Sequence, residues 1–220
     1  MADDIYTAVT FAPIQSFIEK SRKLRDLYGS SFILSYLARA ICEKAKSKLG
    51  DDAVISPALI NVTQGTPNQI IIKGEFPEEE AKQTFDYAWE TLMKFCREWI
   101  EEEIKGNWQY QWQYEWDLWT NHAWEFFCGK GTSIDDVREN MNEVKRQRNW
   151  VALNWIGESS SLSGTDAIAY PTMSNKIAYN QRNFQDKEET IKQFYQALQQ
   201  KLGNAFCDET EQLNIPELVK

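Results

Sequence analysis

The sequence has a single histidine, His122, among its 220 residues, and its four cysteines are far apart. One histidine excludes metal clusters built from several histidines, His-Asp nuclease dyads within this chain and most triads that need a histidine base. Because no two cysteines form a C-x-x-C pair, the sequence does not predict a structural zinc site, and such cysteines are typical of a reducing cytoplasm. Walker A and G-x-G-x-x-G patterns are also missing, so neither a P-loop nor a dinucleotide site is predicted.

Long apolar runs are missing as well. No stretch of about 18 consecutive apolar residues occurs, and the acidic start MADDIYTAVTF does not predict a signal peptide. A formal net charge of −9 argues against a protein that coats nucleic acid with its whole surface. With 42% hydrophobic residues, the chain can still build a sizeable core. We therefore expect a folded cytoplasmic protein that makes no membrane contact.

The first 130 residues alternate between strand and helix patterns. IYTAVTFA predicts a strand at residues 5–12, and a helical pattern follows in which Gly29 predicts a kink or a break between two helices. Two more strands (53–62 and 68–76), a helix from Pro77 to about Ile104 and a fourth strand (122–129) complete the order βαββαβ. This order predicts an α+β fold with a ferredoxin-like domain over residues 1–130, in which helices cover one face of an antiparallel sheet.

Residues 131–220 predict a mainly helical extension. SIDDVRENMNEVKRQR has an acidic start and a basic end, as the helix dipole favours, and a second amphipathic helix covers residues 186–206. Between them lies a long polar loop, residues 157–175. Asn214, followed by Pro216 and Glu217, predicts the start of a last helix. We expect this part to lead into a following domain.

The segment NWQYQWQYEWDLW, residues 107–119, is ambiguous, because its aromatic residues fit both the alternation of a strand and one face of a helix. The tryptophans suggest two roles. They could stack on the bases of a single strand, or they could pack this segment into a core. Because no basic residue lies between Gly106 and Lys130, we favour packing.

Two acidic pairs resemble metal-binding motifs only superficially. The sequence LGDD contains Asp51 and Asp52, but it follows a helix and precedes a strand, so Gly50 reads as a helix C-cap and the aspartates as turn residues. Asp135 and Asp136 lie in the first turn of a predicted helix, where carboxylates are stabilising. We expect no catalytic residue and no metal ligand in this chain.

A basic cluster stands out in this acidic chain: Arg22, Lys23 and Arg25 follow the turn FAPIQS after the first strand. Backbone N–H groups at a helix N-terminus favour phosphate, and Arg and Lys can pair with it. Alternatively, these charges belong to a solvated helix face that Glu19 and Asp26 balance.

The whole stretch resembles a known family. Five short motifs match, in order and without gaps, the first palm domain of the CRISPR-associated large palm polymerase subunit of type III effector complexes, in its Cmr form. These motifs are Pro13-Ile14-Gln15, Phe17-Ile18, Arg22-Lys23-Leu24-Arg25-Asp26, Tyr28-Gly29-Ser30 and Leu34-Ser35-Tyr36-Leu37. Weaker similarities are WTNHAWEFF and the final EQLNIPELVK. The resemblance covers most of this chain but only the first quarter to third of a full family member.

The resemblance implies an antiviral role in a guide-RNA ribonucleoprotein that senses target RNA. The complete subunit would use ATP with Mg to make cyclic oligoadenylate, with catalysis in a second palm domain that this chain lacks. Other subunits of the complex are then the expected partners, and guide RNA and target RNA are indirect ones. The residues expected to face the nucleotide cleft or a neighbouring domain are Gln15, Arg22, Lys23, Arg25, Ser30 and Ser31.

Two other functions remain open. The chain could be a purely structural scaffold for protein–protein contacts, which the five tryptophans of residues 108–124 favour because aromatic residues anchor interfaces. It could also be an independent nucleotidyl cyclase. That activity needs two metal-holding carboxylates after the first strand, where this sequence has Ala12, Pro13 and Gln15.

Overall fold

We describe the protein from a computed structural model, which covers residues 5–148, 155, 157–174, 184–208 and 210–220. The chain forms two compact units that alternate along the sequence. The sheet unit comprises Met1–Glu19, Leu27–Thr91 and Trp124–Ala152. The helical unit comprises Lys20–Asp26, Leu92–Ala123 and Leu153–Lys220. These boundaries differ from the division at residue 130 that the sequence suggests.

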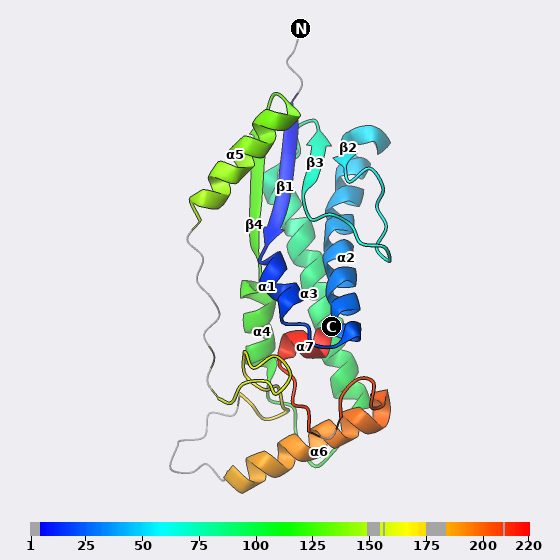
Figure 1. Cartoon of the computed structure of the whole chain (residues 1–220), viewed down its shortest axis with the longest axis vertical. Coiled ribbons are helices and arrows are strands. Elements are labelled where there is room, and N and C mark those ends of the chain that lie inside the picture. The colour runs from blue at the N-terminus through cyan, green and yellow to red at the C-terminus, as the bar shows by residue number, and fades with distance from the viewer. Residues whose placement is uncertain (1–4, 149–154, 156, 175–183, 209) are drawn as a thin grey trace. The chain divides into compact units, whose positions relative to one another are not determined.

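Four antiparallel strands form the centre of the sheet unit, in the order β2-β3-β1-β4. Their bounds are Tyr6–Ala12 for β1, Val54–Ser56 for β2, Ile70–Lys73 for β3 and Glu125–Gly131 for β4. Helices α1 (Ile14–Glu19) and α2 (Leu24–Leu49) connect β1 to β2, and α3 (Glu78–Glu103) and α4 (Gln113–His122) connect β3 to β4 (Figure 1). The predicted α+β class, the βαββαβ order and the antiparallel sheet are confirmed.

Helices cover both faces of this sheet, so the expectation that they cover only one was wrong. On one face, Phe11 of β1 lies 4.8 Å from Phe85 of α3, measured between ring centroids. On the other face, Ala8 packs with Val137 and Met141 of helix α5 (Ile134–Arg146). Residues 8 and 11 point to opposite faces because side chains alternate along a strand. The sequence predicted α5, but its amphipathic pattern does not say which surface it covers.

Two glycines of β4 allow α5 to lie close to the sheet. An added Cβ at Gly129 would lie 2.7 Å from the backbone nitrogen of Met141, and one at Gly131 would lie 2.5 Å from that of Val137. Both distances are shorter than Cβ contacts normally are, so any larger residue would push the helix away. Ser133 caps the same helix, because its side chain accepts a hydrogen bond from the Asp136 N–H.

Strands β2 and β3 are much shorter than predicted, at three and four residues. Pro57 directly follows β2 and has no N–H to donate to a strand ladder. Polar side chains then stabilise a loop instead: Asn61 Oδ1 accepts hydrogen bonds from the Thr63 and Gln64 N–H groups. The Thr66 N–H donates to Ser35 Oγ of α2 at 2.8 Å, which attaches this loop to the helix.

The predicted break at Gly29 was also wrong. Helix α2 runs through Gly29 without interruption, and the break lies earlier, between α1 and α2. A glycine inside a helix costs only about 1 kcal/mol. The buried residues Ile33, Leu37 and Ile41 recur at helical spacing after it, and their packing outweighs this cost.

The helical unit is assembled from the end of α3, from α4, and from helices α6 (Phe184–Leu202) and α7 (Ile215–Val219). Trp112 and Trp116 are each 1% exposed, and the ring of Trp112 lies 5.6 Å from that of Phe194 of α6. For these two tryptophans the packing interpretation is confirmed. The ambiguous segment forms α4 from Gln113 onward and no strand before it, and β4 begins at Glu125 because α4 continues to His122.

Polar groups fix the loops of the helical unit. The fully buried Tyr195 hydroxyl lies 2.8 Å from the Ala169 carbonyl oxygen and accepts a hydrogen bond from the Leu213 N–H at 2.8 Å. Asn214 forms a complete capping box with Glu217 at the start of α7, which confirms the predicted helix start. The predicted polar loop contains only isolated bridges between residues 157 and 174, and its last predicted residue, Asn175, lies outside the described residues.

Candidate functional site

The basic cluster lies in the helical unit, in a segment that we call the basic turn, residues 20–26. It begins directly after α1 and ends in the first turn of α2. Asp26 is fully buried and accepts a hydrogen bond from the Lys23 N–H at 3.3 Å. This contact satisfies an N–H group at the start of α2 that has no partner within the helix. The local sequence thus explains why α2 starts here.

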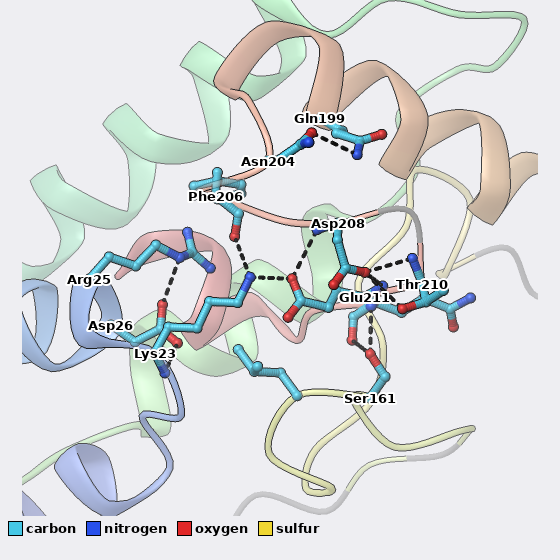
Figure 2. A network of polar contacts seen from close by, with 12 residues as sticks. Lys23, Arg25, Asp26, Ser161, Gln199, Asn204, Phe206, Asp208, Thr210 and Glu211 are labelled. Atoms are coloured by element: carbon cyan, nitrogen blue, oxygen red, sulfur yellow. Dashed lines mark hydrogen bonds and ion pairs between the residues drawn. The ribbon is translucent and has the colours of Figure 1, made fainter.

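Lys23 is bound to a distant part of the chain (Figure 2). Its Nζ forms an ion pair with Glu211 Oε2 and lies 3.5 Å from the Phe206 carbonyl oxygen. The side chains of Lys23 and Glu211 are only 26% and 15% exposed. The positive charge of Lys23 is therefore compensated inside the protein by a residue 188 positions later in the sequence.

A short polar turn holds Glu211 in place (Figure 2). Asp208 Oδ1 accepts hydrogen bonds from the N–H groups of Thr210 and Glu211 and from Thr210 Oγ1, and the Asp208 N–H donates to Glu211 Oε2 at 3.0 Å. The Thr210 side-chain hydrogen bond, followed by its backbone one, lowers the pKa of the Asp208 carboxyl below its ordinary value. The hydrogen bonds of this turn thus position the Glu211 carboxylate for its ion pair with Lys23.

Arg25 is also occupied by contacts within the protein. Its guanidinium carbon lies 4.0 Å from the centre of the Phe206 ring, and its Nε lies 3.1 Å from Asp26 Oδ1. Burial raises the pKa of the neighbouring Cys207 thiol to about 11, although the charges of Arg25 and Lys23 act in the opposite direction. Arg25 therefore stabilises the segment around Phe206 and does not extend freely into solvent.

Two further lysines belong to the same region of the helical unit. Lys20 forms an ion pair of 2.6 Å with Asp166, a residue with a positive φ of 60°. Burial lowers the pKa of Lys220 to about 8, and Glu217 and Asp26 partly oppose this effect. The cations around the basic turn are thus matched by carboxylates that lie close to them in space.

Arg22 differs from its neighbours, because its side chain is exposed and forms no ion pair with the described residues. The other candidate residues belong to the sheet unit. Gln15 is exposed on α1 and donates a hydrogen bond to Glu19 Oε1 at 2.7 Å. Ser30 is fully buried in α2, and Ser31 is half-buried beside the loop that contains Gly65. Helix α1 has only six residues, so its dipole favours an anion less than that of a longer helix.

The sequence pointed to Asp26, which pairs with Arg25, but not to the distant partners of the basic turn. Phe206 and Glu211 are about 180 residues away from Lys23, and nothing in the local pattern links the two segments. Only a three-dimensional structure brings them together. The one available signal was the charge imbalance: a basic cluster in an acidic chain requires counter-ions, and these turn out to be internal for Lys20, Lys23 and Arg25.

Asp51 and Asp52 lie in a short 3-10 turn, Asp51–Ala53, after Gly50, whose φ is 104°. Within the described ranges, no group of three or more His, Cys, Asp or Glu side chains could hold a metal ion. The described helices also include none that is both long and apolar enough to cross a membrane.

Comparison with known proteins identifies the family. Residues 6–217 match the family model described as CRISPR-associated protein Cmr2, N-terminal. The chain therefore belongs to this family, and the resemblance seen in the sequence is confirmed. Membership makes the chain part of a type III CRISPR effector subunit. No curated protein matches the chain closely enough to count as a relative.

Proposed function

We propose that the chain is a non-catalytic assembly module of its effector subunit, and that part of α2 is the contact surface for a neighbouring domain or subunit. The observation that carries this proposal is an exposed apolar face, formed by Leu27, Tyr28 and Phe32. Their side chains are 46%, 67% and 52% exposed. All three lie in the part of α2 that belongs to the sheet unit.

The composition around this apolar face supports a protein partner. Residues 27–38, LYGSSFILSYLA, contain no charged side chain, whereas the rest of α2 contains several, including Arg25 and Asp26 before this stretch and Arg39 and Glu43 after it. Centres of protein interfaces are depleted in charge and enriched in aromatic residues. Contiguous exposed apolar side chains on a soluble protein are typical of interaction sites. A solvated helix face would carry charges throughout, as the second half of α2 does.

The proposal is tested by assembly of the complete effector complex with Tyr28→Asp and Phe32→Asp, separately and together. Removing an interface anchor typically costs about 2 kcal/mol or more, so we expect the double variant to bind the other subunits at least roughly 30-fold more weakly. Tyr87→Asp is a matched control, because Tyr87 is also an exposed tyrosine of the sheet unit, at 72%. Normal assembly of the Tyr28 and Phe32 variants would rule out this surface.

A second candidate function is a contribution to a nucleotide cleft. In this proposal the complete subunit joins ATP, held with Mg, into cyclic oligoadenylate, and assembles with guide RNA and senses target RNA. The first palm domain then supplies half of the cleft without catalytic carboxylates. The observation that favours it is the exposed Arg22, which stands in the basic turn without an ion-pair partner among the described residues. Gln15, Lys23, Arg25, Ser30 and Ser31 remain candidates for contacts in the assembly.

Arg22→Ala tests this second function in the reconstituted complex. Loss of one charge-assisted phosphate contact costs roughly 1.5–3 kcal/mol, which corresponds to an ATP affinity about 10- to 150-fold lower. Arg39→Ala is the control, because Arg39 is an exposed arginine that pairs only locally with Glu43. If ATP affinity and oligoadenylate output are the same in both variants and the wild type, Arg22 does not bind nucleotide.

A further inference from the structure

A groove in the helical unit lies between residues 105–108 and one side of α6. Its volume is about 260 Å³, and its lining includes Lys105, Asn107, Trp108, Gln193, Gln196 and Gln200. We propose that this groove binds one unpaired nucleobase of a single-stranded RNA. The site shares no residue with the basic turn or the apolar face, so it does not depend on either function proposed above.

The size of the groove suits a single planar ring. Pockets for drug-sized ligands have volumes of about 300–1,000 Å³, so the groove lies just below this range. It has room for one base, whereas the sugar and the triphosphate of a whole nucleotide would remain outside. The expected ligand is therefore a base within a strand.

Side-chain amides dominate one wall of the groove. Gln193, Gln196 and Gln200 recur every three to four residues, so they lie on the same side of α6. A primary amide offers a donor and an acceptor next to each other, which matches the edge of a base, and Asn and Gln pair in this way with adenine. The side chains of Asn107, Gln196 and Gln200 form no hydrogen bond with the described residues, so their amides are available to a ligand.

The charge pattern of α6 distinguishes this wall from an ordinary solvated face. Residues 193–200, QFYQALQQ, carry no charge, whereas residues 186–192, DKEETIK, carry five. An amide-rich face next to an aromatic residue can form hydrogen bonds to a ligand without requiring it to be charged. This is the chemistry expected for reading a base and not for attracting a phosphate.

One aromatic residue, Trp108, lines the groove together with these amides. The indole of Trp108 lies against Gly106 so closely that an added Cβ there would be 1.9 Å from a ring carbon. Phe194 of α6 contacts the same indole in an edge-on arrangement, with ring centroids 6.0 Å apart. The indole is thus held in position before a ligand arrives. Unpaired bases stack on aromatic side chains of this kind in single-strand binding proteins.

Phosphate contacts contribute little at this site. Lys105 is the one charged residue in the lining, and its Nζ already donates a hydrogen bond to the Glu101 carbonyl oxygen at 2.6 Å. Salt weakens single-strand binding with a slope of about −0.7 for each neutralised phosphate. We therefore expect the logarithm of the binding constant to fall with the logarithm of salt concentration with a slope no steeper than about −0.7, whereas a basic surface would give a much steeper slope.

The test uses the full chain and a fluorescently labelled RNA heptamer of adenosine, with binding followed by anisotropy. The variant is Gln196→Ala combined with Gln200→Ala, because both side chains are exposed and their removal leaves the core intact. Losing two hydrogen bonds worth about 0.5–1.5 kcal/mol each predicts roughly 5- to 150-fold weaker binding. Gln199→Ala is the matched control: this residue is on the same helix, outside the lining, and donates to Asn204 Oδ1 at 3.0 Å (Figure 2).

An abasic heptamer of the same length and charge provides the second arm. We expect it to bind as weakly to the wild type as the adenosine heptamer binds to the double variant. Equal binding of both strands, or an equal loss for Gln199→Ala, would overturn the proposal. If the groove instead binds an extended peptide, replacing Gln196 and Gln200 will not change the binding of either RNA strand. That result would also overturn the proposal.

Discussion

Aromatic packing occurs in both units of this protein, but the helical unit adds ion pairs between residues that are 146 and 188 positions apart in the sequence. In the sheet unit, aromatic rings from strands and helices pack together: Trp124 lies 5.7 Å from Phe11, 4.9 Å from Phe17 and 5.5 Å from Trp89, measured between centroids. In the helical unit, polar groups far apart in sequence hold loops and helices together, as Lys23 and Glu211 do. Apolar packing tolerates changes of salt and pH, whereas ion pairs at partly exposed sites do not.

This difference has a consequence for function. The sheet unit presents its apolar face on a helix that also contributes the buried residues Ile33, Leu37 and Ile41. The helical unit uses most of the basic turn for its own stability, which leaves Arg22 as the exposed cation of that segment. The apolar face of the sheet unit and the exposed Arg22 of the helical unit can therefore be changed and tested separately.

The largest effect is expected from Phe85→Ala, which opens a cavity in the sheet unit. Phe85 is 1% exposed and contacts Phe11 and Phe126, so its removal should lower the free energy of unfolding by ~3–5 kcal/mol. Hydrogen exchange of the β1 and β3 amides measures this locally. Tyr87→Ala, at an exposed position of the same helix, is the control. Unchanged protection of β1 would contradict the packing described for this face.

Thiol reactivity should show how well the sheet unit buries its cysteines Cys42 and Cys128. Burial raises the pKa of Cys42 from 9.0 to about 12 and that of Cys128 to about 11. Each pKa unit lowers the thiolate fraction below the pKa about tenfold, so labelling at pH 8 should be slower than in the unfolded chain by roughly 1,000-fold for Cys42 and roughly 100-fold for Cys128. Fast labelling of the native protein would show that these thiols are accessible.

The same shifts predict a pH dependence of stability. The folded state raises the pKa of these thiols, so it binds more protons than the unfolded state above pH 9. Their contribution is fully present below pH 9 and is lost as the pH rises toward 11–12. An alkaline denaturation series should therefore show decreasing stability from about pH 9 upward, and replacing Cys42 with Ser should reduce this slope.

Tyr195→Phe should destabilise the helical unit more than the sheet unit. The change removes the hydroxyl that contacts Ala169 and Leu213 and leaves buried backbone groups without a partner, which costs ~1–3 kcal/mol. We expect faster hydrogen exchange in α6 and little change in β1. If both units lose protection equally, they unfold as a single cooperative body and the contrast between them is wrong.

The smallest effect concerns the ion pair between Lys23 and Glu211. A double-mutant cycle with Lys23→Ala and Glu211→Ala should give a coupling free energy of roughly 0.5–1 kcal/mol, because both side chains are still partly exposed. High salt should reduce this value. A coupling near zero at low salt would mean that the turn around Asp208, and not the ion pair, positions Glu211.

Much of the sheet unit was predictable, because its signals are local and periodic. The strand before Pro13 and the helix that starts after Pro77 follow from local spacing and from proline, and α5 follows from its acidic start and basic end. Two local signals failed. Gly29 did not break α2, since packing outweighed its propensity, and β2 ended early, since Pro57 and Asn61 favour a loop.

The candidate site was much less predictable. The sequence identified the basic cluster, the family and Asp26 as a counter-ion, which pairs with Arg25. It did not identify Phe206 and Glu211 as partners of Lys23, because contacts over about 180 residues leave no local pattern. It also grouped Gln15 and Ser30 with the cluster, whereas the structure places them in the sheet unit and buries Ser30. Trp108 was treated together with Trp112 and Trp116, but it lines a groove while the other two are buried.

The central claim is that the apolar face of α2 is an assembly surface, and hydroxyl-radical footprinting of the complete effector complex tests it most directly. The account predicts that Tyr28 and Phe32 are oxidised readily in the isolated chain and strongly protected after assembly. Tyr87, which is 72% exposed, serves as the internal reference. Equal oxidation of Tyr28 and Phe32 before and after assembly, with protection appearing elsewhere, would contradict the claim.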